Sequence, residues 1–519
     1  MNNIQMLIVM VIYMAAVIGI GLYFAKRANE NPENYFLGGR SLGPWIAAMS
    51  AEASDMSGWL LMGLPGVAYF YGLSDAIWTA IGLLAGTYIN WLIVAKRLHA
   101  YSIIAEDAIT IPEFFSNRFH EKKKIIMMIS ALFIMVFFTI YASSCFVTVG
   151  KLFGTLFDIP YQYMMIAGAV FVIIYTFLGG FLAESTSDFM QAVVMIVVLV
   201  GVLVTGMISA GGIGAVYDNL QQIPGFLEFF GISTPTVGTD GLQQLSQSGA
   251  PLFGEAGGYG LLTILSTLSW GLGYFGMPQV LLRFMAIRSY KEIKKSRRIA
   301  TVWCAISLIA AVFIGITGRA IYPAVHLTAA DSEKIFITMA MGHLPTILAG
   351  LAMAGILAAT ISSSDSYLLI ASSAVSKNIY QGLFKKNVTD KQIMNMARIV
   401  LLAISLIGVI IALDESSIIF RVVSFAWAGF GATFGPIMLF SLFWKRTTRE
   451  GAVAGMLTGG GMVFVWKLLI KPIGGIFGIY ELLPAFILSC IAIVVVSLLS
   501  KEPDELLQTE FKSAKYYKK

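Results

Sequence analysis

Charged residues are scarce in this chain. Asp, Glu, Lys and Arg make up 12% of its 519 residues, whereas hydrophobic residues make up 57%. Soluble globular domains contain about 25% charged residues, so the composition excludes an ordinary water-soluble enzyme. It also excludes a disordered chain, which requires low hydrophobicity. In so apolar a chain the net charge of +6 is more typical of cytoplasmic loops than of nucleic-acid binding. We therefore predict an integral membrane protein with no nucleic-acid partner.

Histidine and cysteine are also rare. The spacing of the four histidines matches neither a zinc site nor a catalytic triad, so we expect no enzyme. The three cysteines are odd in number and lie in apolar stretches, which predicts small buried residues rather than disulfides or metal ligands. These residues are His99, His120, His326 and His343, and Cys145, Cys304 and Cys490.

Long hydrophobic runs fill the chain. A helix needs about 20 mostly apolar residues to cross a bilayer, and thirteen stretches meet this requirement. We predict an all-α integral membrane protein with one transmembrane domain (1–500) and a cytoplasmic tail (501–519). The expected spans are residues 5–25, 43–66, 72–95, 125–150, 161–180, 189–211, 258–282, 299–321, 345–376, 397–413, 421–443, 450–470 and 481–500.

The distribution of basic residues predicts the orientation, because Lys and Arg concentrate on the cytoplasmic side. With the N-terminus outside, 29 of the 35 Lys and Arg residues fall on the inner side. The longest polar connection, residues 212–257, contains none and is expected outside. The first span follows no basic residue, so we expect it to be retained rather than removed as a signal. We therefore expect a multi-pass plasma-membrane protein with its N-terminus outside and its C-terminus in the cytoplasm.

Two expected spans are interrupted. The second carries polar and acidic residues in SAEASDMS (50–57), and the seventh carries glycines and a proline in WGLGYFGMP (270–278). Such a pair at matching positions indicates the binding site of a secondary transporter. The two lie five spans apart, so the spans over 43–211 and 258–443 are expected to form inverted repeats of five helices. The first span and the last two lie outside the repeats. Glycines in membrane helices also serve close packing, which is the alternative reading.

Asp55 is the strongest functional candidate in the second span. An ionisable side chain near the middle of a bilayer costs at least a few kcal/mol, so it indicates function by default. The alternative is a structural partner for a neighbouring helix end. Glu52 lies a turn nearer the cytoplasm, where water is an alternative partner.

The ninth span contains a polar cluster, SSSDS (362–366). On a helix Ser362 shares a face with Asp365 and Ser366. Hydroxyl and carboxylate oxygens are the ligands that hard cations prefer, although serines also bond to their own helix carbonyls. Carbonyls released by a break near Ala53 and Met56 would add ligands if the two helices meet.

Trp270, Tyr274 and Pro278 recur at intervals of four residues. This pattern is typical of core packing. An aromatic wall beside glycines also suits an apolar ring with a cationic amine, and both readings stay open.

Six motifs resemble the sodium/solute symporter family, in the right order and over nearly the whole chain. They are YFLGGRSLGP (35–44), SAEASDMSGWLLMGLPG (50–66), FFTIYASS (137–144), SWGLGYFGMPQVLLRFM (269–285), SFAWAGFGATFGP (424–436) and RTTREGAVAGMLTG (446–459). The resemblance implies a leucine-transporter-type 5+5 inverted-repeat core with thirteen spans and an outside N-terminus.

The resemblance also implies which residues bind. A sodium ion would lie among Ala53, Met56, Ala359, Ser362 and Ser363, with Asp55 beside it. A possible second cation site would use Asp188, Asp365 and Ser366 together with Ser362. The solute site would comprise Ser57, Gly58, Tyr141, Trp270, Tyr274 and Pro278. Asp365 and Glu52 stand where the family has small residues, so the number of cations stays open.

The motifs are most similar to those of family members that import L-proline. We therefore expect sodium-coupled import of L-proline by alternating access, with L-proline, sodium and membrane lipid as partners and no obligatory protein partner. The alternative is a sodium- or proton-coupled symporter of another small solute. A transporter-like sensor would need a signalling domain, for which the tail after Ser500 is too short.

Overall fold

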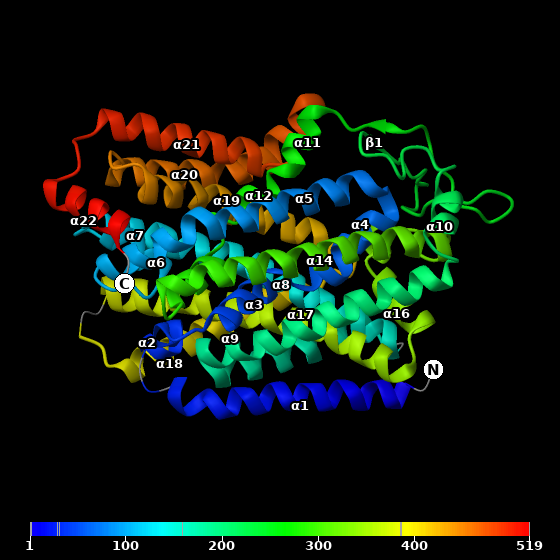
Figure 1. The fold of residues 1–519 in the computed structure, drawn as a ribbon, viewed down its shortest axis with the longest axis horizontal. Helices are drawn as coiled ribbons and strands as arrows, with labels where there is room; N and C mark the ends of the chain where they lie inside the picture. Colours follow the sequence, from blue (N-terminus) through cyan, green and yellow to red (C-terminus); the bar gives the residue numbers. More distant parts are fainter. Residues whose placement is uncertain (1–2, 29, 31, 158, 385–386, 518–519) are drawn as a thin grey trace.

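The structure is a computed structural model that describes residues 3–28, 30, 32–157, 159–384 and 387–517. Its helices run side by side along the long axis (Figure 1). Within the described residues ten helices are long and apolar enough to cross a membrane, and three shorter apolar helices accompany them. Each expected span overlaps one of these helices. The shorter ones correspond to the second, fifth and seventh expected spans.

The long helices carry most of the chain. They are α1 (Asn3–Ala28), α5 (Leu73–Ile89) with η3 (Asn90–Val94) and α6 (Ala95–Ile104), α8 (Ile125–Phe157), α9 (Tyr161–Ser209), α14 (Ile293–Ile321), α17 (Thr346–Ser373) with η5 (Ala374–Phe384), α18 (Asp390–Ile411), α19 (Ile419–Phe443), α20 (Arg449–Val465) and α21 (Leu482–Leu499). Two crossings are broken into pieces, which are α3 (Pro44–Asp55), η2 (Trp59–Gly63) and α4 (Leu64–Tyr71), and α11 (Leu261–Leu268), α12 (Trp270–Gly273) and α13 (Pro278–Ala286).

Short elements connect the crossings. They are α2 (Pro32–Leu37), η1 (Gly38–Arg40), α7 (Ile111–Arg118), α10 (Ile213–Leu220), η4 (Tyr290–Glu292), α15 (Ala329–Ser332), α16 (Ile335–His343), η6 (Trp466–Ile470), η7 (Lys471–Ile473), η8 (Gly475–Gly478) and α22 (Glu505–Tyr516). Strands β1 (Gly231–Ile232) and β2 (Gly257–Gly258) pair antiparallel, and the long segment 212–257, which is expected outside, covers one end of the bundle (Figure 1).

The core lies around α17 and α19. The most apolar windows of the crossings that contain these two helices are 78% and 83% buried, whereas that of α1 is only 18% buried. The α1 helix runs along one side of the bundle, and α20 and α21 run along the opposite side (Figure 1). Helix α3 of the first broken crossing contacts helix α13 of the second, and both helices contact α17. The two breaks therefore lie inside protein.

Residues 181–188 were expected to connect two spans, and this expectation is wrong. They belong to α9, which bends at Gly180. Gly180 has φ 60° and ψ 178°, a conformation that glycine adopts readily and other residues do not. The second half of α9 therefore begins at the kink and carries Glu184 and Asp188 into the bundle, where both are buried.

A row of glycines on α20 packs this helix against its neighbours. A Cβ atom at Gly455 would lie 2.2 Å from Ile493 Cγ1 on α21, and one at Gly459 would lie 1.9 Å from the Ala432 carbonyl oxygen on α19. Only glycine permits such close approach of backbones. The α20–α21 hairpin is therefore packed closely against α19.

The cysteines are placed as predicted. Cys145 and Cys304 are buried, Cys490 is partly buried, and all three are free thiols.

The tail forms a helix that docks on the body. Helix α22 lies against α6, and the Phe511 ring packs edge-on against Tyr101 at 6.5 Å and under the Arg97 guanidinium at 5.1 Å. Phe511 is 9% exposed, whereas Leu506 on the same helix is 59% exposed. One aromatic side chain therefore contributes much of the docking.

We expect Phe511→Ala to release α22. Losing a buried aromatic contact of this kind costs on the order of 1–3 kcal/mol, so trypsin should cleave at Lys512 and Lys515 about tenfold or more faster. The rate is measured on purified protein by mass spectrometry. Leu506→Ala is the matched control and should leave the cleavage rate unchanged. Equal cleavage rates in the two variants would contradict the role of Phe511 in docking α22.

Candidate functional site

The first break separates α3 from η2. Met56 has φ −82° and ψ 67°, which is not helical, and the Ser57 N–H donates to the Asp55 carbonyl at 3.0 Å. Gly58 follows, and a Cβ atom there would lie 2.4 Å from Thr148 Oγ1 on α8. The break therefore fits closely against α8, and its freed backbone groups stay enclosed by protein.

The second break lies between α12 and α13. Pro278 occupies the first turn of α13, where its missing N–H costs nothing. Cβ atoms at Gly271, Gly273 and Gly276 would collide with Gly82, Trp427 and Phe430, respectively, at 1.9 to 2.3 Å. Of the two readings of these glycines, close packing is therefore the one that the structure supports.

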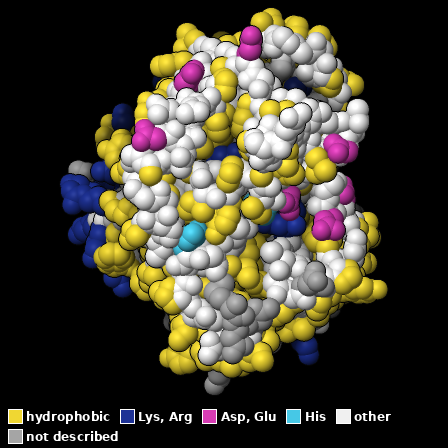
Figure 2. Space-filling view, turned by 90° about the vertical axis from the view of Figure 1, so that its right-hand side faces the viewer, with side chains coloured by type: hydrophobic (Ala, Val, Ile, Leu, Met, Phe, Trp, Pro, Cys, Tyr) yellow, Lys and Arg dark blue, Asp and Glu magenta, His cyan; other side chains and the backbone are white. Residues whose placement is uncertain are grey.

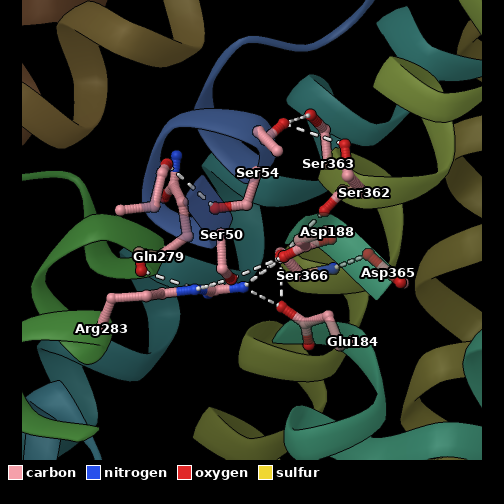
Figure 3. A network of polar contacts seen from close by, with 12 residues as sticks. Ser50, Ser54, Glu184, Asp188, Gln279, Arg283, Ser362, Ser363, Asp365 and Ser366 are labelled. Carbon is pink, nitrogen blue, oxygen red and sulfur yellow. Dashed lines mark hydrogen bonds and ion pairs between the residues drawn. The ribbon is translucent and has the colours of Figure 1, made fainter. Parts of the chain in front are cut away.

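A carbonyl of the first break meets the serines of α17. The Ala53 carbonyl oxygen accepts hydrogen bonds from Ser362 Oγ at 2.9 Å and from Ser363 Oγ at 3.4 Å (Figure 3). Ser362 Oγ also lies 3.2 Å from the Ala359 carbonyl. We call these residues, with Met56 at the end of α3, the oxygen cage. Its ligands are neutral oxygens, and within the described residues no cluster of three His, Cys, Asp or Glu suits a metal ion. Such a donor set fits a hard monovalent cation.

Asp55 lies beside this cage but faces the second broken crossing. Its Oδ1 accepts from Gln279 Nε2 at 3.3 Å, and its backbone carbonyl accepts from the Tyr141 hydroxyl at 3.2 Å. Asp55 is buried, so its carboxylate influences both breaks in a medium of low dielectric constant. Glu52 is buried too, which excludes bulk water as its partner.

The predicted solute residues lie around both breaks. The Trp270 ring packs edge-on against Trp59 at 5.9 Å, and its carbonyl accepts from Trp427 Nε1 at 2.8 Å. Tyr274 packs edge-on against Trp427 at 5.0 Å, and within the described residues its hydroxyl has no partner. Tyr141 is tied to the first break through the Asp55 carbonyl. Trp59, Trp270, Trp427 and Tyr274 therefore form one continuous aromatic wall, and Tyr141 contacts the first break separately.

A cavity of about 590 Å³ opens beside this wall, and we call it the outer vestibule. Ile232, from the segment 212–257 that is expected outside, lines it together with the adjoining Gly258 and Tyr259, so the cavity lies at the end of the bundle that this segment covers. The surface of this end is hollowed, with Lys and Arg side chains visible in its recesses (Figure 2). Among the predicted solute residues Trp270 alone lines the outer vestibule; Ser57, Tyr141 and Tyr274 are buried behind it.

Arg283 on α13 joins four elements near the inner end of the site. Its Nε donates to Ser50 Oγ at 2.9 Å, and its Nη2 donates to Asp188 Oδ2 at 3.2 Å and to Ser366 Oγ at 3.0 Å (Figure 3). Nη2 also pairs with Glu184 Oε1. We call these five residues the arginine cluster. It links the inner halves of both broken crossings to α9 and α17.

The arginine cluster was not foreseen as a unit. The expected seventh span (258–282) ends before Arg283, and this boundary is wrong because α13 continues to Ala286 and the Arg283 side chain is fully buried. Glu184 and Gln279 were not singled out either. An ionisable residue inside an apolar segment, as in PQVLLRFMA (278–286), was the available signal.

The residues expected for a second cation lie at this cluster. Asp188 and Ser366 are both bonded to Arg283, so a guanidinium stands where that cation was expected. Asp365 Oδ1 accepts from its neighbour's backbone N–H at 2.8 Å, and its Oδ2 has no partner within the described residues.

Together the fold and the arrangement of two broken crossings beside the oxygen cage and the aromatic wall are those of a secondary transporter of the leucine-transporter type. The chain belongs to the sodium:solute symporter family, whose pattern matches residues 35–459. It is 42% identical to the sodium/proline symporter of Staphylococcus aureus strain NCTC 8325, over 98% of this chain and 95% of the relative. The same identity and coverage hold for the sodium/proline symporter of strain USA300.

Solved structures share the fold. The substrate-bound, outward-open state of a Na⁺-coupled sialic acid symporter is similar with a TM-score of 0.76 at 20% identity, over 96% of this chain and 99% of that one. MhsT in complex with L-phenylalanine is similar with a TM-score of 0.52 at 15% identity, over 88% of this chain and 97% of that one.

We expect Arg283→Gln to destabilise the protein strongly. Removing one partner of a buried ion pair leaves the other charges uncompensated and typically costs about 3–5 kcal/mol. Arg283→Lys should also be destabilising, because one ammonium cannot reach acceptors on three other elements. Thermal unfolding in detergent measures both.

Arg288→Gln is the matched control. Its side chain is 58% exposed and pairs only with Glu292 in the same segment, so its melting temperature should equal that of the wild type. The double variant Arg283→Gln/Glu184→Gln should recover part of the loss. A melting temperature for Arg283→Gln equal to that of the control would disprove the structural role of the arginine cluster.

Proposed function

We propose that this protein imports L-proline together with sodium across the plasma membrane by alternating access. The observation that carries the proposal is the junction of the first break with α17, where the Ala53 carbonyl meets Ser362 and Ser363. The 42% identity to sodium/proline symporters over 98% of the chain supports L-proline as the solute.

Sodium would bind in the oxygen cage formed by Ala53, Met56, Ala359, Ser362 and Ser363. The two serine hydroxyls donate to the Ala53 carbonyl, and on sodium binding they would turn their oxygens toward the ion. The nearby Asp55 carboxylate favours the positive charge without contacting it. Binding would hold α3 against α17 and so fix the geometry of the first break.

Proline would bind between the two breaks. Its carboxylate would meet the freed N–H groups near Ser57 and Gly58, where the helix that begins at Trp59 presents its positive end. Its ring would pack on Trp270 and Tyr274, with Pro278 and Tyr141 completing the pocket. Sodium and proline then share the first break, so each strengthens binding of the other by the same factor.

One end of the site is open to a cavity and the other is closed by hydrogen bonds, as in a transporter that is open to the outside. The outer vestibule reaches Trp270, while the arginine cluster holds the inner halves of α3 and α13 together. Inward release would require these hydrogen bonds to separate. One positive charge moving through 100 mV gains about 2.3 kcal/mol, which is about fifty-fold in accumulation.

We further propose thirteen spans, with the N-terminus outside and the tail in the cytoplasm. The elements from α3 to α9 and from α11 to α19 would form the inverted repeats, and α1, α20 and α21 would flank them. A second cation at Asp188, Asp365 and Ser366 would have to displace the Arg283 guanidinium. We therefore expect that one sodium ion is transported with each proline.

Uptake of radiolabelled L-proline into proteoliposomes tests the function. Uptake should require an inward sodium gradient, should rise with an inside-negative potential, and should be absent when choline replaces sodium. Equal uptake in choline would exclude sodium coupling, and uptake driven by a proton gradient would favour the proton-coupled alternative. If proline fails while another small solute accumulates with sodium, the family mechanism stands and the solute is wrong.

Two adjacent serines test the oxygen cage. Ser363→Ala removes one cage oxygen, so the sodium concentration for half-maximal proline uptake should rise about tenfold. Ser364→Ala is the matched control, because its Oγ donates only within its own helix, at 2.6 Å to the Thr360 carbonyl and at 3.3 Å to the Ile361 carbonyl. A sodium dependence of Ser363→Ala equal to that of the control would remove this hydroxyl from the site.

A further inference from the structure

Tyr480 reaches the proposed solute pocket from outside the repeats. It lies in the connection between α20 and α21, residues 471–481, which we call the outer strap. Its ring stacks on Trp270 with centroids 5.2 Å apart and planes 24° from parallel. The other aromatic neighbours of Trp270, which are Trp59, Phe420 and Trp427, meet it at 35° or more. Tyr480 is therefore the side chain that lies flattest on this indole.

The strap holds Tyr480 by both ends of the residue. Its backbone N–H donates to Ser266 Oγ on α11 at 2.7 Å, and its hydroxyl donates to the Ser424 carbonyl on α19 at 2.6 Å. The next residue, Glu481, is buried and pairs with Lys471 at 3.0 Å and with Lys467 at 3.4 Å. The ring is thus fixed to both halves of the core and to its own hairpin.

The hydroxyl contact is available at all physiological pH values. Burial, together with the Glu481 carboxylate, raises the pKa of the Tyr480 phenol well above its ordinary range. The phenol therefore stays protonated and can only donate to the carbonyl, so the stack on Trp270 keeps one geometry.

The strap also forms part of the wall of the outer vestibule. Gly478, Ile479 and Tyr480 line this cavity next to Trp270. A solute that enters from outside passes these residues before it reaches the wall of the pocket. The position of the Trp270 ring then sets the space left for the ring of the solute.

We propose that Tyr480 is a positioning residue of the solute pocket, which fixes the Trp270 ring and thereby restricts the pocket to solutes with a small ring. This inference rests on the proposed function, because it takes Trp270 as the wall that contacts the solute. It assigns the α20–α21 hairpin a role in solute selection rather than in packing alone.

Uptake by proteoliposomes tests the proposal through three variants. Tyr480→Ala should raise KM for L-proline tenfold or more, with Vmax within twofold of the wild type and the sodium dependence unchanged. It should also improve competition by L-pipecolate, the six-membered-ring homologue, relative to proline. Tyr480→Phe keeps the stack but loses the bond to the Ser424 carbonyl, so it should raise KM only a few-fold. Phe477→Ala, in the same strap and 38% exposed, should match the wild type.

A second readout needs no solute. Removing the Tyr480 ring should expose Trp270, so acrylamide should quench the fluorescence of Tyr480→Ala more strongly than that of the wild type. The increase should vanish in Tyr480→Ala/Trp270→Phe when compared with Trp270→Phe. Unchanged quenching, or unchanged KM and selectivity in Tyr480→Ala, would overturn the proposal. If the wild type carried no proline but quenching changed as expected, the proposed solute would fail while the contact of Tyr480 with Trp270 stood.

Discussion

The structure depends on one constraint: an unpaired backbone N–H or carbonyl is too costly to expose to lipid. Two crossings nevertheless lose their helical hydrogen bonds halfway, at Met56–Gly58 and at residues 274–277. Both breaks must therefore be enclosed by other helices, and the crossings that contain α17 and α19 are the most buried of the long crossings in the described residues. The glycines beside the second break also help to enclose it, since they let neighbouring helices approach it closely.

Within the enclosed region, the uncharged oxygens of the oxygen cage and the charged side chains of the arginine cluster form two separate groups. The oxygen cage consists of carbonyl and hydroxyl oxygens, which carry no net charge. The arginine cluster pairs a guanidinium with carboxylates, which is a permanent arrangement in a medium of low dielectric constant. Ser362 of the cage and Ser366 of the cluster lie one turn apart on α17, and Ser366 Oγ donates to the Ser362 carbonyl at 3.0 Å. A shift of α17 against α3 would therefore disturb both sets together.

The sequence predicted the elements better than the partners. Apolar length located the ten long helices, and the residues SDMSG located the first break, because these features belong to a single segment. The approach of Ser362 to Ala53 was predicted only on the condition that the two helices meet. Glu184 was missed because the polar run AESTSD (183–188) resembles a connection between spans, and its burial becomes possible only through Arg283, almost 100 positions later in the chain. Arg283 lies one residue beyond the expected seventh span (258–282), because a basic residue after an apolar run resembles the end of a span. A pattern along one segment does not reveal a charge supplied by another.

The glycine row of α20 has a mechanical consequence. Because its backbone touches both α19 and α21, the hairpin has no freedom to slide, and any tilt of α19 must carry α20, α21 and the exposed turn at Ile476 with it. That turn would amplify a small rotation at the membrane midplane into a larger displacement at the surface. A spectroscopic label attached there would report the transport cycle at a distance from the binding residues, without altering any of them.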